Sequence, residues 1–204
     1  AILLNEVLNS QGIKSIFVDP KDAGIIVHGQ PNDADISPET YVNLDKLHLP
    51  EDSKAVFPGF FGYSQDGSIY TFSRGGSDIT GALLSRGLHA DLYENFTDVD
   101  AIYVANNHVV KHPQAIKKMS YREMRELSYA GCSVFQDEAI IPAVKGQVPV
   151  NVKNTNNPEA DGTLIVPEQF LFNPANKITG IACSKRFSAL YIHRYLLNKE
   201  VGFT

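Results

Sequence analysis

The sequence has 204 residues, of which 43% are hydrophobic and 20% are charged, and its formal net charge is -5. This composition is ordinary for a soluble globular protein and excludes the disordered and fibrous classes. Acidic and basic residues alternate along the chain without a basic block, so nucleic acid is not an expected partner.

The cysteines and the apolar runs indicate the compartment. Cys132 and Cys183 lie far apart and outside any C-x-x-C spacing, which speaks against a zinc site or a disulfide scaffold. No apolar run approaches the roughly 20 residues of a membrane span, and residues 1–8 lack the basic flank of a signal peptide. We therefore expect a cytoplasmic protein without a membrane partner. Because residues 1–8 have the pattern of a helix interior and no start methionine, we expect the chain to begin inside a larger protein.

The first part of the chain predicts a helix, a strand and a second helix. Apolar residues recur at helical spacing over 3–8, and Gly12 stands where a left-handed residue would end that helix. Residues 15–19 have the pattern of a short buried strand. Ser37-Pro38-Glu39 is typical of a helix start, because proline fits the first turn and a carboxylate is stabilised by the positive end of the helix dipole.

The middle of the chain predicts a hairpin followed by a helix and a strand. An apolar run over 55–63 leads to a turn at 65–67, and residues 68–73 then alternate like a strand. Directly afterwards, a glycine pair at 75–76 precedes a helical pattern that continues to Leu88. The pair therefore lies at a strand-to-helix junction. Residues 90–99 form the next strand.

The last part continues the alternation of strand and helix. Ser120 and Glu123 form a capping box that opens a helix expected to end at Gly131. A short strand at 134–135, a helix over about 137–144 and strands over 148–153 and 163–166 follow. This order predicts an α/β fold, a three-layer sandwich in which helices cover both faces of a mainly parallel sheet. Residues 167–177 are expected to be a linker, and 178–199 have the pattern of a second unit.

The segment 74–78 is the first candidate binding site. Two glycines let backbone N–H groups approach a ligand, and the following helix presents its positive end. Arg74 suits a carboxylate, which it can hold through two parallel hydrogen bonds, and Asp78 suits an ammonium group. The pair therefore fits both charged ends of an amino acid. In a purely structural alternative, Gly75 and Gly76 form a tight turn, Ser77 caps the helix and Asp78 stabilises its dipole.

Strand ends provide a second candidate site. Thr97 and Asp98 lie at the carboxyl end of a strand, where parallel sheets bind ligands in the crevice beyond the strands. Asp98 suits the ribose, the phosphates or the metal of a nucleotide, although Asp at a strand end is equally common in turns. Lys153 ends another strand and offers a cation to the same edge, or else is a solvated loop residue.

Other patterns exclude several common sites. The six histidines show no metal-ligand spacing such as H-E-x-x-H, so no metal held by the protein alone is predicted. The glycines at 59–62 and 75–76 match neither the Walker loop nor the G-x-G-x-x-G fingerprint. A nucleotide would therefore need a different phosphate cradle.

Five segments carry a family resemblance through their order and spacing: VFPGFFG at 56–62, TFSRGGSDIT at 71–80, FTDVD at 96–100, SYREMREL at 120–127 and VKNT at 152–155. Together they resemble the aspartokinase family, within the amino acid kinase superfamily. The resemblance covers nearly the whole chain, and over 121–131 and 178–204 it is strongest to the monofunctional aspartokinases of Gram-positive bacteria.

The resemblance implies a fold and a domain order. Residues 1–167 would form the C-terminal part of an amino acid kinase catalytic domain, an α/β sandwich around a mainly parallel, eight-stranded sheet. Residues 168–204 would form a linker and the beginning of an ACT regulatory domain. Paired ACT domains imply allosteric control and a homo-oligomer.

The resemblance also implies an activity. The γ-phosphoryl group of ATP, whose phosphates Mg²⁺ bridges, would be transferred to the side-chain carboxylate of L-aspartate to give 4-phospho-L-aspartate. This is the first step towards lysine, threonine and methionine. The implied roles are aspartate binding for Arg74, Gly75, Gly76, Ser77 and Asp78, nucleotide binding for Thr97, Asp98, Tyr103 and Lys153, and catalysis for Arg74 and Asp98.

Some features depart from the family pattern. The family's Lys-Phe-Gly-Gly-Thr-Ser segment, which supplies a phosphate-stabilising lysine, is not among these residues, so we expect this polypeptide alone to be inactive. Ala101, Asn107, Ser133 and Gln136 differ from the residues usual at their positions and affect the expected nucleotide contacts. The alternative to an enzyme is a noncatalytic amino-acid-binding or assembly module. A kinase of the same superfamily acting on another substrate would not continue into 178–204.

Overall fold

The computed structural model describes residues 1–106, 109–130, 139–170 and 178–182. In chain order the elements are α1 (Ile2–Ser10), β1 (Ser15–Phe17), β2 (Val27–Gln30), β3 (Asp33–Ile36), α2 (Pro38–Asp45), β4 (Lys54–Val56), β5 (Phe61–Tyr63), β6 (Ile69–Thr71), α3 (Gly76–Gly87), β7 (Tyr93–Thr97), β8 (Lys118–Ser120), α4 (Tyr121–Tyr129), α5 (Ile141–Gly146), β9 (Val150–Asn154), β10 (Thr163–Val166) and the 3-10 turn η1 (Glu168–Phe170). The alternation confirms the α/β class. Among the described residues, no helix has the length and apolar character that a membrane crossing requires.

The largest sheet has four strands in the order β7-β9-β10-β8. β7 is parallel to β9 and β8 is parallel to β10, whereas β9 and β10 are antiparallel. The antiparallel pair follows from the short connection over 155–162, because a parallel connection needs a crossover of a dozen or more residues. The sheet is mostly parallel, as predicted. The described residues do not form the single eight-stranded sheet that the resemblance implied, because β1 with β4, β2 with β3 and β5 with β6 form separate pairs.

Local sequence signals predicted several element ends correctly. Helix α1 ends before Gly12, whose φ of 78° is in the left-handed region. Helix α2 begins at Pro38, directly after Ser37. In α4 both bonds of the capping box are present: the Glu123 N–H donates to Ser120 Oγ at 3.1 Å, and the Ser120 N–H donates to Glu123 Oε2 at 2.7 Å.

Other predictions need correction or lie outside the described residues. The helix expected over about 137–144 begins at Ile141, after a turn at 139–140. Pro142 explains this start, because its missing N–H and fixed φ suit the first turn of a helix. The predictions for Gly131, for the strand at 134–135 and for 183–199 fall outside the described residues.

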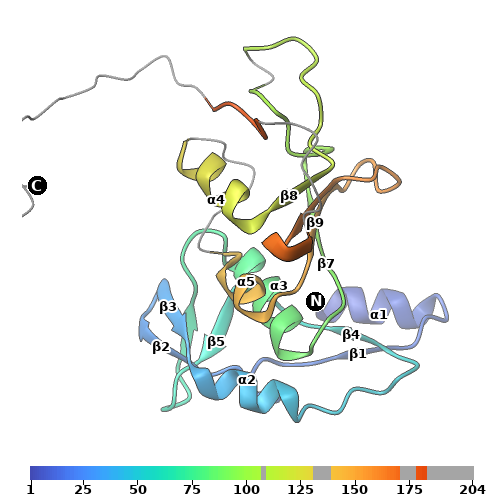
Figure 1. Ribbon diagram of the computed structural model, residues 1–204. Helices are drawn as coiled ribbons and strands as arrows, with labels where there is room; N and C mark the ends of the chain where they lie inside the picture. The colour runs from blue at the N-terminus through green and yellow to red at the C-terminus, as the bar shows by residue number, and fades with distance from the viewer. Residues whose placement is uncertain (107–108, 131–138, 171–177, 183–204) are drawn as a thin grey trace, which may run out of the picture.

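Helix α3 lies near the centre of the molecule (Figure 1) and contributes side chains to two hydrophobic cores. Ala82 belongs to the core formed by the four-stranded sheet with α4 and α5, whereas Leu83 belongs to the core formed with α2 and the N-terminal strands. Both side chains are fully buried. Because close-packed layers hold the helix on two sides, its orientation relative to β7 is fixed.

Gly87 allows α3 to approach α2 closely. A Cβ at this position would lie 2.4 Å from Cδ1 and 2.8 Å from Cβ of Leu44, which is 1% exposed. We expect Gly87→Ala to lower the free energy of unfolding by about 1–3 kcal/mol, since overpacking outweighs the helix-propensity gain of roughly 0.5–1 kcal/mol. Thermal unfolding should show a Tm lower by about 2–4 °C for each kcal/mol. Shortening Leu44 as well should make the two losses less than additive; fully additive losses would rule out the steric explanation.

Candidate functional site

The N-terminus of α3 has a backbone shape that requires glycine. Gly75 precedes the helix with φ 84° and ψ 17°, in the left-handed region. A Cβ on the next residue, Gly76, would lie 2.8 Å from the ring of Phe60. Any larger side chain would therefore collide with the aromatic ring or strain the turn. The glycine pair that the sequence placed at a strand-to-helix junction is at that junction.

The first turn of α3 presents free backbone donors. The Ile79 N–H donates to the Gly75 carbonyl at 2.9 Å, which closes the first turn of the helix. The N–H groups of Gly76, Ser77 and Asp78 precede this bond, and no side chain in the described part of the chain caps them. Ser77 is exposed within the first turn, so the idea that it caps the helix is wrong. These donors, with the positive end of the helix dipole, suit an anionic group.

Arg74 stands beside these donors with an unengaged side chain. It is exposed, and within the described residues no hydrogen bond or ion pair involves its guanidinium group. A guanidinium group without a partner is available for bidentate binding of a carboxylate. Arg74, Gly75, Gly76 and Ser77 therefore line one small region of donors and positive charge.

Asp78 is held in place by β7. The Asn95 side-chain amide donates to Asp78 Oδ1 at 2.9 Å and to the Tyr93 hydroxyl at 2.8 Å. The Tyr93 hydroxyl in turn donates to the Asp78 carbonyl at 3.4 Å. Burial raises the pKa of Tyr93 to about 12, although the hydrogen bond from Asn95 acts in the opposite direction. Tyr93 is therefore neutral at pH 7 and keeps the hydroxyl hydrogen that it donates to the Asp78 carbonyl.

The carboxyl ends of β7 and β9 lie side by side, as the sequence predicted. Thr97 pairs with Asn154 in the parallel register, and the Thr155 N–H donates to the Thr97 carbonyl at 2.8 Å. Asp100 Oδ1 accepts hydrogen bonds from Asn154 at 2.8 Å and Asn157 at 3.3 Å, which joins the loops that follow the two strands. Asp98 is exposed at this edge, and its Oδ1 accepts from the Thr97 hydroxyl at 3.2 Å.

Lys153 points to the other face of the sheet. It pairs with Phe96 in the register, so its side chain is on the face opposite to Asn95 and Thr97. Its Nζ lies 3.4 Å from Glu94 Oε1 and 5.8 Å from the centre of the Phe96 ring. The structure thus brings Lys153 to the predicted edge, with its ammonium group turned away from Asp78.

Tyr103 lies on a segment that starts near the same edge. The Ile102 N–H donates to Thr163 Oγ1 at 2.8 Å at the beginning of β10, which is the strand antiparallel to β9. Tyr103 itself pairs with Ala115 in an isolated antiparallel β-bridge. The segment around Tyr103 is therefore bonded to the sheet on the edge that carries Thr97 and Asp98.

The two candidate regions are adjacent. Asn95 holds Asp78, and Thr97 is two residues further along the same face of β7, roughly 7 Å away at 3.3 Å per residue. Neither Asn95 nor Phe60 was predicted from the sequence as a site residue. Asn95 could have been found from the sequence, because it is a polar residue at a position of β7 where alternation predicts a buried side chain. No sequence pattern pointed to Phe60. Its φ of 84°, unusual for a residue other than glycine, is visible only in the structure.

A family model described as the amino acid kinase family matches residues 1–154. The chain belongs to the amino acid kinase family. It is 51% identical over 203 residues to aspartokinase 3 of Bacillus subtilis. The aligned region covers 100% of this chain and 44% of that protein. The predicted resemblance to the aspartokinases is confirmed.

Solved structures agree with this family. A crystal structure of Clostridium acetobutylicum aspartate kinase superposes with a TM-score of 0.75 at 39% identity, covering 89% of this chain and 38% of that one. The structure of Escherichia coli aspartokinase III in complex with aspartate and ADP superposes with a TM-score of 0.73 at 28% identity. The superposition covers 81% of this chain and 38% of that one. This amino acid kinase family chain thus spans less than half the length of these relatives.

Proposed function

We propose that this chain is part of an aspartate kinase that transfers the γ-phosphoryl group of ATP to the side-chain carboxylate of L-aspartate. The observation that carries the proposal is the hydrogen bond from Asn95 to Asp78, because it sets the anion-binding start of α3 beside the carboxyl end of β7. The similarity to the Escherichia coli enzyme that binds aspartate and ADP supports the same assignment.

Substrate binding follows from the charges at α3. Arg74 and the N–H groups of Gly76 and Ser77 bind a carboxylate of L-aspartate, and the Asp78 carboxylate accepts hydrogen bonds from its ammonium group. Asn95 keeps Asp78 in position for this contact. These groups orient the second carboxylate of the substrate towards the edge of the sheet at Thr97.

The nucleotide would bind at the edge formed by Thr97, Asp98 and Tyr103. One oxygen of Asp98 is bonded to Thr97 and the other has no partner among the described residues, so it suits a hydroxyl group of the ribose or one ligand position of Mg²⁺. The described residues contain no group of three His, Cys, Asp or Glu side chains arranged to hold a metal ion. Mg²⁺ would be bound mainly by the nucleotide phosphates and would neutralise part of their negative charge, with Asp98 as the protein group available to it.

The chemical step needs no base from the protein. An oxygen of the substrate carboxylate is already ionised and forms the new bond to the γ-phosphorus, while the bond to the β,γ-bridging oxygen breaks and ADP leaves with its electrons. The protein must align two anions that repel each other, which requires cations and backbone donors. Arg74 meets this need on the aspartate side, and Asp98 positions the nucleotide.

We further propose that residues 1–167 are the C-terminal part of the catalytic domain and that 168–204 begin an ACT regulatory domain. The extension of the Bacillus subtilis similarity over 203 residues supports a continuation of that kind. Homo-oligomer formation through ACT domains remains a prediction.

A direct assay tests the proposed activity. The full-length protein should phosphorylate L-aspartate in the presence of ATP and Mg²⁺, and hydroxylamine should trap the acyl phosphate as the hydroxamate. Asp78→Ala should raise KM for L-aspartate, because the ammonium group loses its acceptor, with circular dichroism checking that the fold persists. A folded full-length protein that binds L-aspartate but forms no hydroxamate would instead support the noncatalytic binding module.

A further inference from the structure

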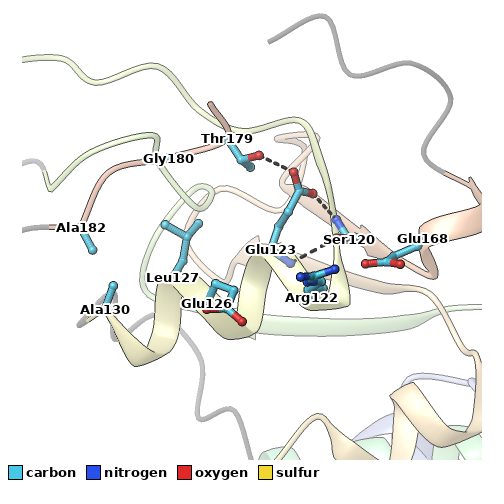
Figure 2. Close-up of a pocket in the computed structure, with 10 residues that line it drawn as sticks. All are labelled: Ser120, Arg122, Glu123, Glu126, Leu127, Ala130, Glu168, Thr179, Gly180 and Ala182. Carbon is cyan, nitrogen blue, oxygen red and sulfur yellow. Dashed lines mark hydrogen bonds between the residues drawn. The ribbon is translucent and has the colours of Figure 1, made fainter. Parts of the chain in front are cut away.

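Residues 178–182, here called the strap, return to the kinase fold after β10. The Thr179 hydroxyl donates a hydrogen bond to Glu123 Oε1. The other oxygen of the same carboxylate, Oε2, accepts the Ser120 N–H at 2.7 Å in the capping box of α4. Figure 2 shows Glu123 between these two donors. One carboxylate thus closes the start of α4 and holds the strap.

The other end of the strap reaches the segment that carries Tyr103. The Ile181 N–H donates to the Val104 carbonyl at 2.7 Å, and Ile181 forms a parallel bridge with Ala105. Between the two attachments, a Cβ on Gly180 would lie 3.1 Å from a methyl carbon of Leu127 and 3.4 Å from the Val104 oxygen. The strap therefore lies close against both α4 and the Tyr103 segment at this point.

The strap is not packed continuously against α4. A cavity of about 560 Å³ lies beside it, lined by residues that include Leu127, Ala130, Glu168 and Ala182 (Figure 2). A segment with few buried apolar contacts opens more easily than a close-packed core does, so each hydrogen bond that it keeps matters for its position. The Thr179 bond to Glu123 and the approach of Gly180 to Leu127 are therefore the contacts that hold the strap on α4 beside Val104.

We propose that Thr179 and Glu123 are positioning residues for the nucleotide site: they fix the strap, and the strap fixes the segment of Tyr103. The inference rests on the proposed nucleotide-binding role of Tyr103. A displaced strap would release the Val104 carbonyl and loosen one side of the Tyr103 segment, whose other side is held by the Tyr103–Ala115 bridge and by the Val104 N–H bond to the Gln114 carbonyl at 2.9 Å. Within the described residues the hydrogen bonds and the β-bridge of the strap go to α4 and to residues 104–105, not to the start of α3, so the aspartate site should not change.

The test compares Thr179→Val with Thr179→Ser in the full-length protein. Valine keeps the shape and removes the hydroxyl donor, so we expect a KM for ATP and a Kd for ADP raised by about tenfold, as for loss of a hydrogen bond to a charged group. KM for L-aspartate should stay unchanged. Serine keeps the donor and should restore the ATP values. Ser10→Ala, which removes the hydroxyl that bonds to Val7 in the distant helix α1, is the control for hydroxyl loss.

Amide hydrogen exchange provides a readout that does not depend on activity. In Thr179→Val, exchange of the Ile181 amide and of the peptide over 102–106 should be faster than in the wild type. Unchanged exchange would overturn the mechanical link, and faster exchange with an unchanged Kd for ADP would overturn the positioning role. A wild-type protein that binds no ADP would refute the proposed nucleotide site and this inference with it, whereas an active enzyme with unchanged ATP values in Thr179→Val would refute the inference alone.

Discussion

Arg74→Ala in the full-length protein is expected to reduce kcat/KM for L-aspartate by about 100- to 10,000-fold. The change would remove the two charge-assisted hydrogen bonds proposed to the substrate carboxylate, each worth roughly 1.5–3 kcal/mol, and every 1.36 kcal/mol corresponds to a factor of about ten. Arg74→Lys should recover only part of the loss, because an ammonium group keeps the charge without the planar pair of donors. Initial rates of hydroxamate formation at varied L-aspartate concentrations measure both effects.

Because Arg74 is exposed, its substitution should affect substrate binding and not the stability of the fold. Within the described residues its side chain contacts no partner that the substitution would leave unpaired, so Tm should not change. Arg125→Ala is a matched control, because this arginine is also exposed and its closest acid, Glu126, lies at 3.9 Å. The aspartate-site assignment is refuted if both variants keep wild-type kcat/KM.

Asn95→Leu is expected to lower kcat/KM for L-aspartate by about 10- to 100-fold without direct contact between residue 95 and the substrate. Leucine has a similar volume but cannot donate to Asp78 Oδ1, which now receives a bond of 2.9 Å. Loss of a hydrogen bond to a charged group costs roughly 1.5–3 kcal/mol, and here the cost appears as a misplaced Asp78. KM for L-aspartate should rise, while KM for ATP should change much less.

A second amide controls for general destabilisation. The Asn43 side chain donates to the Gly24 carbonyl at 2.9 Å, outside the site, so Asn43→Leu removes a comparable bond without affecting Asp78. It should lower Tm and leave KM for L-aspartate unchanged. Equal effects of the two variants on KM would mean that the hydrogen bond between Asn95 and Asp78 has only a structural role.

Structural features that depend on residues close together in the chain were predicted correctly from the sequence. The capping box at Ser120 and the glycine pair at 75–76 act over three or four residues, and the structure has both where the sequence placed them. Periodicity was a weaker guide to burial. The apolar residues of α1 correctly predicted a helix, yet Leu3 is 76% exposed while Asn5 in the same helix is buried.

The sequence alone determined the α/β class, most element positions, the family resemblance and the two candidate sites at α3 and β7. Only the tertiary structure decided that Asn95 holds Asp78, that the ammonium group of Lys153 lies on the opposite face of the sheet and that the strap meets Val104. The physical reason is the same in each case. Propensities, caps and turns depend on residues a few positions apart, whereas these contacts join segments 17 to 77 positions apart in the chain, and they form only when the sheet register and helix packing bring those segments together.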